Sequence, residues 1–143
     1  MKRLILCALF IPIAVKPGSN RSHNYEGTHL VEVRSGDWPI NLERDIDDRD
    51  TSYSLLFRDK QVLTSVLMDT LSFANLTQLK YFGKALTVLK TGNNGDIAKF
   101  KDYSIKRADK KYEGTWFILR YRWGLTDFQQ SEADLLISTI RGL

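Results

Sequence analysis

The chain has 143 residues, of which 43% are apolar, 11% aromatic and 27% charged. This composition is typical of a globular protein and excludes collagen-like and largely disordered classes, and the length fits one domain. The formal net charge of +4 is unevenly distributed. Residues 20–73 hold six Lys and Arg against ten Asp and Glu, whereas residues 74–143 hold twelve against seven. A basic second half suggests a polyanion-binding face, although solvated lysines are the simpler explanation.

The N-terminal segment has the pattern of an export signal. Met1, Lys2 and Arg3 form a basic start, and the 12 residues of 4–15 are apolar, too few for a membrane span of about 20. We expect a signal peptide over residues 1–15, a tether over 16–28 and a single domain over 29–143. The alternatives are a buried N-terminal element or a wrongly assigned start. Cys7 is the only cysteine, so removal of the signal would leave no thiol, as in a disulfide-free protein of a bacterial periplasm or surface.

Residues 29–51 are predicted to form one strand followed by one connection. Residues 29–34 alternate well enough for a short edge strand, and Pro39 opposes a central strand immediately after it. Residues 40–51 are rich in aspartate and are expected to form a solvated connection. Their spacing lacks the central glycine and distal glutamate of a calcium-binding EF-hand loop.

A pattern that occurs twice predicts the fold. Tyr53-Ser54 and Tyr103-Ser104 each open a hairpin, and the second strand of each hairpin, 62–68 or 116–123, is followed by Phe73 or Phe128. Helices are predicted over 76–89 and 133–140 from apolar residues at helical spacing, with Asn75 and Ser131 as N-caps. We therefore expect an α+β fold of order β-ββα-ββα, with one antiparallel sheet and both helices on one of its faces.

The most informative strand for function is 115–123. Strict alternation assigns Phe117, Leu119, Tyr121 and Trp123 to the core face, and Trp116, Ile118, Arg120 and Arg122 to the other face, which Ser104 and Lys106 of the neighbouring strand should share. Arginine and lysine around aromatic and apolar groups suit single-stranded nucleic acid, but a protein or glycan surface uses the same residue types. The candidate binding surface is Trp116, Ile118, Arg120, Arg122 and Lys106.

No catalytic motif is evident in the sequence. His23 and His29 both precede the repeated units, so Ser-His and Cys-His catalysis and a zinc site have no suitable parts. The carboxylates Asp102, Glu113 and Asp127 lie at element ends without a defined spacing. We expect no enzyme activity, no cofactor and no metal.

The sequence thus favours a small exported, non-enzymatic binding or interaction module in the periplasm or at a cell surface. Its partner would be an unknown protein or glycan, or a second copy bound through an edge strand or the Trp116 face. The alternative is a cytoplasmic single-stranded nucleic-acid-binding protein that uses the same face. A carboxylate-dependent enzyme is a third hypothesis without positive evidence.

Overall fold

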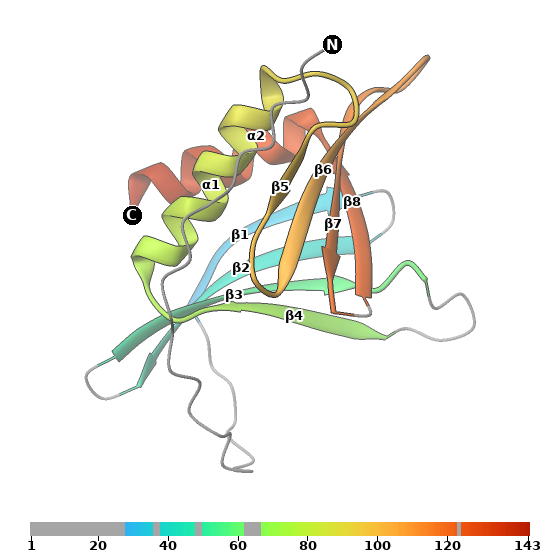
Figure 1. The fold of residues 1–143 in the computed structure, drawn as a ribbon. Helices are drawn as coiled ribbons and strands as arrows, with labels where there is room; N and C mark the ends of the chain where they lie inside the picture. Colours follow the sequence, from blue (N-terminus) through green and yellow to red (C-terminus); the bar gives the residue numbers. More distant parts are fainter. Residues whose placement is uncertain (1–27, 36–37, 48–49, 62–66, 123) are drawn as a thin grey trace.

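The fold repeats one arrangement, four antiparallel strands followed by a helix (Figure 1). The computed structural model of the chain describes residues 28–35, 38–47, 50–61, 67–122 and 124–143. The first set is β1 (Thr28–Ser35), β2 (Trp38–Asp47), β3 (Asp50–Arg58), β4 (Met68–Phe73) and α1 (Leu76–Lys90). The second set is β5 (Ile97–Lys99), β6 (Tyr103–Lys110), β7 (Gly114–Tyr121), β8 (Gly124–Gln129) and α2 (Gln130–Gly142).

The strands form two sheets, each with its strands in chain order. The α+β class is therefore confirmed, with antiparallel strands and two helices, but the expected β-ββα-ββα order in one sheet is not. Each helix closes a set of four strands instead of two. The two copies of the Tyr-Ser pattern also fall on different strands of their sets, because Tyr53 lies in the third strand of the first and Tyr103 in the second strand of the second.

The prediction of a charged connection over residues 40–51 is wrong, because residues 40–47 belong to β2 and residues 50–51 to β3. Ile40 and Leu42 are buried on one face of β2, while Asn41 and Glu43 alternate with them on the other face. The charges obscured a period-2 pattern that is present in the sequence. Pro39 is the second residue of β2 and pairs with Arg34 of β1, whereas the pairing of β2 with β3 begins at Asn41, so proline stands where this strand has one neighbour.

Two short strands were missed at the edges of the second sheet. β5 has three residues, and β8 pairs with β7 from its first residue, with Gly124 opposite Tyr121. The predicted edge strand is confirmed as β1. The expected signal peptide, the tether up to residue 27, most of the predicted strand 62–68 and Trp123 lie outside the described residues.

The core is shared by both sheets and both helices. It contains Leu42, Leu55 and Phe57 from the first sheet, and Ile105, Phe117, Leu119 and Phe128 from the second, all completely buried. Helix α1 contacts β3 and β4 of its own set and β5 and β6 of the other, whereas α2 contacts β1 as well as β7 and β8. Each helix therefore covers apolar surface of both sheets.

The helices begin at defined caps and approach each other closely. The side chain of Asn75 accepts a hydrogen bond from the Gln78 backbone N–H (3.0 Å), as predicted. The predicted cap of α2 at Ser131 is wrong, since the helix begins at Gln130 and the Glu132 carboxylate accepts from the Gln129 N–H. Where the helices meet, a Cβ added to Gly83 would lie 3.2 Å from Ile140 Cγ2, so glycine permits the approach.

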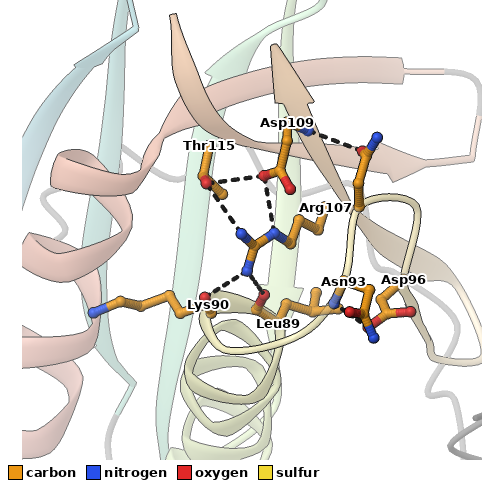
Figure 2. A network of polar contacts seen from close by, with 8 residues as sticks. Leu89, Lys90, Asn93, Asp96, Arg107, Asp109 and Thr115 are labelled. Atoms are coloured by element: carbon orange, nitrogen blue, oxygen red, sulfur yellow. Dashed lines mark hydrogen bonds and ion pairs between the residues drawn. The ribbon is translucent and has the colours of Figure 1, made fainter. Parts of the chain in front are cut away.

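Arg107 joins the end of α1 to the second sheet (Figure 2). Its Nη1 donates to the carbonyl oxygens of Leu89 (3.0 Å) and Lys90 (2.5 Å) in the last turn of α1, and the Leu89 carbonyl also accepts from the Gly92 N–H (3.2 Å). Its Nε donates to Asp109 Oδ1 (3.0 Å), and its Nη2 to Thr115 Oγ1 (3.3 Å). One guanidinium therefore satisfies the C-terminus of α1 and holds it against β6 and β7.

Replacing Arg107 by methionine should destabilise the protein by about 2–3 kcal/mol, because two helix-terminal carbonyls and a carboxylate lose their charged donor. Urea unfolding of the full chain measures the change. The matched control is Arg34→Met, whose side chain is 72% exposed and pairs only with Glu32, and which should cost less than about 1 kcal/mol. Equal costs for the two variants would contradict the role given to Arg107.

Candidate functional site

The alternation predicted for β7 is confirmed for the residues described. Phe117 and Leu119 are completely buried and Tyr121 is nearly so. Trp116, Ile118 and Arg120 alternate with them, and the register pairs Ile118 with Lys106 and Arg120 with Ser104. The outer face of the second sheet thus carries the predicted residues of β6 and β7 together.

The predicted surface is nevertheless divided along the strand. Trp116 lies near the β6–β7 hairpin, opposite Ala108 and Gln129. Arg120 lies four residues further along, about 13 Å away at the rise of a strand, and Arg122 lies in the β7–β8 turn with φ = 46°. Trp116 and Ile118 are half-buried, whereas Lys106, Arg120 and Arg122 are exposed.

Trp116 already has a cationic neighbour. The Lys110 ammonium lies 3.8 Å from the centroid of its ring, the geometry of a cation–π contact. Its indole Nε1 is buried and has no hydrogen-bond acceptor among the described residues. The ring is therefore engaged on one face and turned inward at its polar edge, which makes it a poor platform for stacking a base.

Arg120 and Arg122 instead line a basic hollow of about 300 Å³ at the other end of the face. Lys99 and Lys101, from the end of β5 and the turn after it, complete a set of four cations. Of the described residues in the lining, Asp102 is the only carboxylate, and Tyr103, Ser104 and Phe100 supply the remaining surface. None of the four cations forms an ion pair within the described ranges.

Two turns are held together to form this basic hollow. The Phe100 N–H donates to the Tyr103 carbonyl (2.8 Å), which closes the turn between β5 and β6. The Arg122 N–H lies 3.5 Å from the Asp102 carbonyl and links this turn to the one between β7 and β8. The backbone thus sets the two lysines and two arginines beside one another, without a compensating set of carboxylates.

The inner wall of the basic hollow is aromatic and rigidly packed. The rings of Phe100 and Tyr103 stack with centroids 4.3 Å apart, and Tyr103 also meets Phe73 of β4 and Phe82 of α1 at 6.3 and 6.1 Å. Burial raises the pKa of the Tyr103 phenol far above its ordinary value. Tyr103 therefore stays neutral at physiological pH and adds no negative charge to the basic hollow.

A second polar cluster links the two sheets at the start of β8. Buried Asp59 accepts hydrogen bonds from the Gln61 and Leu125 N–H groups (2.9 and 3.1 Å), and the Lys60 N–H donates to the Leu125 carbonyl (2.7 Å). The Lys60 ammonium pairs with Asp127. The polar groups of this cluster are paired with one another, and we infer that the cluster joins the two sheets.

The carboxylates considered from the sequence are not brought together. Asp102 precedes β6 and Glu113 follows it, so the length of an eight-residue strand separates them. Glu113 pairs with Lys110 (3.1 Å), and Asp127 pairs with Lys60. Within the described ranges, no three His, Cys, Asp or Glu side chains gather in a way that could hold a metal ion.

The sequence identified half of the cations of the basic hollow. Arg120 and Arg122 were predicted as site residues, whereas Lys99 and Lys101 were missed because β5 was not recognised as a strand. The sequence does contain a signal, because residues 99–101 read Lys-Phe-Lys. In an extended segment this order places the two lysines on one face and the phenylalanine on the other.

Comparison of the chain with protein-family models, with curated proteins and with solved structures finds no match. Neither helix of the described part has the length and apolar character that crossing a membrane requires.

The start of α2 should make stability depend on pH. Burial raises the pKa of Glu132 above its ordinary value, although the Gln129 N–H and the Lys60 ammonium favour the carboxylate. Because the pKa is higher in the folded state, the contribution of Glu132 to stability is largest when it is protonated and declines as pH rises through the folded-state pKa.

Glutamine at position 132 retains the acceptor for the Gln129 N–H but does not ionise. Relative to the native chain, Glu132→Gln should therefore gain stability as the pH is raised from about 4 to about 7. Thermal unfolding of both chains across this range measures the difference. A difference that stays constant or changes in the opposite direction would show that burial does not control this carboxyl group.

Proposed function

We propose that the protein is a binding module that uses the basic hollow to recognise a partner or ligand with several closely spaced negative charges. The observation that carries the proposal is the grouping of Lys99, Lys101, Arg120 and Arg122 around one hollow with a single carboxylate and no ion pairs among described residues. Like charges held together repel each other, and an anion relieves that repulsion.

The chemistry of the lining supports an anion with more than one charged group. Two arginines offer planar sets of N–H donors suited to phosphate, sulfate or carboxylate oxygens, and the lysines add point charges. The Ser104 hydroxyl can donate or accept beside them. The described lining residues include no nucleophile with an adjacent base, and we propose binding without catalysis. An acidic protein or glycan outside the cytoplasm, as the export-signal pattern suggests, has the required charge.

Inorganic tripolyphosphate is a suitable probe for the proposal. Isothermal titration of the full chain should show binding that weakens between about 50 and about 200 mM salt. Changing both Arg120 and Arg122 to glutamine should weaken binding by about tenfold per residue, since a charge-assisted hydrogen bond contributes about 1.5–3 kcal/mol.

Two controls locate the effect. Arg34→Gln removes an exposed cation of β1 and should leave binding unchanged. Trp116→Ala should also leave it unchanged, because Trp116 does not line the basic hollow. The proposal fails if the Arg120 and Arg122 changes have no effect, or if Arg34→Gln weakens binding as much.

The second candidate function is binding of single-stranded nucleic acid, favoured by the exposed Lys106 and Arg120 on the same sheet face. The Lys110–Trp116 contact argues against it, because the ring is engaged by a cation. An oligothymidylate titration separates the two. Affinity above that for tripolyphosphate and sensitive to Trp116→Ala would favour nucleic acid, and affinity insensitive to Trp116→Ala would favour recognition of charge alone.

A further inference from the structure

A second hollow lies between the two helices, α1 and α2. It has a volume of about 360 Å³ and is lined from α1 by Lys80, Gly83, Lys84 and Thr87. Helix α2 contributes Ile137, Ile140 and Arg141. This interhelical groove shares no residue with the basic hollow, and its volume is at the lower end of the range of about 300–1,000 Å³ for small-molecule sites.

The interhelical groove has an apolar floor and a cationic rim. Gly83 and Ile140 are buried where the helices approach most closely, and Ile137 continues the floor along α2. Lys80, Lys84 and Arg141 are exposed, and within the described chain none of them has a carboxylate partner.

The surroundings of the groove favour a ligand that combines negative charge with apolar surface. Among the described residues no carboxylate lines it, and Asp134 of α2 is paired with Lys90. The Thr87 hydroxyl donates to the Gly83 carbonyl (2.9 Å), which occupies its proton within the helix.

We infer that the interhelical groove binds a single-chain anionic amphiphile, with the apolar chain along Ile137 and Ile140 and the charged head among Lys84, Arg141 and Lys80. A small anion alone would not use the floor, and a neutral chain would leave three like charges at the rim without a partner. Both parts of the ligand are needed because floor and rim belong to the same groove.

Decyl phosphate is the probe, used with the full chain below its micelle-forming concentration, and amide NMR shifts locate its site. Binding should move the amides of Lys80, Gly83 and Lys84 and raise the melting temperature. Affinity should rise from hexyl to decyl phosphate, by up to about fourfold for each methylene that becomes buried. Decanol should bind at least about tenfold more weakly, because it offers no charge to the rim.

Paired variants distinguish this site from the basic hollow. Changing Lys84 and Arg141 to glutamine should weaken decyl phosphate binding by about tenfold, at about 0.7 kcal/mol for each exposed charge, and leave tripolyphosphate binding intact. Changing Arg120 and Arg122 should have the reverse effect. The inference is overturned if decanol binds as tightly as decyl phosphate, if chain length has no effect, or if the shifts map to the basic hollow.

Discussion

The packing of Tyr103 connects the two halves of the protein and shapes the proposed binding site at the same time. On one side its ring meets Phe73 of β4 and Phe82 of α1, so it ties the start of β6 to the first set of strands and its helix. On the other side it stacks on Phe100 and forms a wall of the basic hollow. Aromatic rings packed against the core have little freedom to rearrange, so the Tyr103 contacts set where the end of β5 and the turn after it, with Lys99 and Lys101, lie relative to Arg120 and Arg122. The backbone positions of the four cations would then be set before a ligand binds.

Neither half of the protein can bury its apolar surface alone. A four-stranded sheet with one helix leaves apolar surface uncovered, and in this fold α1 covers part of the second sheet while α2 covers β1. Polar contacts hold each helix and strand against the other half of the protein. Arg107 satisfies the C-terminus of α1 from β6, and Asp59 and Lys60 at the end of β3 hydrogen-bond to the backbone of Leu125 in β8. These contacts pair polar groups where the two halves of the chain meet.

The sequence was sufficient where one periodic signal dominated. The apolar stripe of α1, its Asn75 cap and the alternation of residues 116–121 all appear as predicted, because propensity, pattern and burial agree there. It was insufficient where charge concealed the pattern, as at Glu43 and Asp45 of β2, or where a strand was only three residues long, as at β5. Of the four cations of the basic hollow, the sequence predicted the two arginines and missed the two lysines, because β5 is so short. Alternation placed Arg120, but the approach of the two turns depends on the Asp102–Arg122 backbone contact and the Tyr103 packing, which no local pattern encodes.

The proposed binding surface depends on a core that both halves of the chain share. Native-state hydrogen exchange measured by NMR on the full chain tests that claim most directly. We expect the slowest amides of β2 and β3 and those of β6 and β7 to exchange with the same free energy of opening, equal to that of global unfolding, with the Ser104 and Arg120 strand amides beside the basic hollow in the same group. Opening of β5–β8 at a clearly lower free energy than β1–β4 would contradict the account, because the four cations would then belong to a separately unfolding unit.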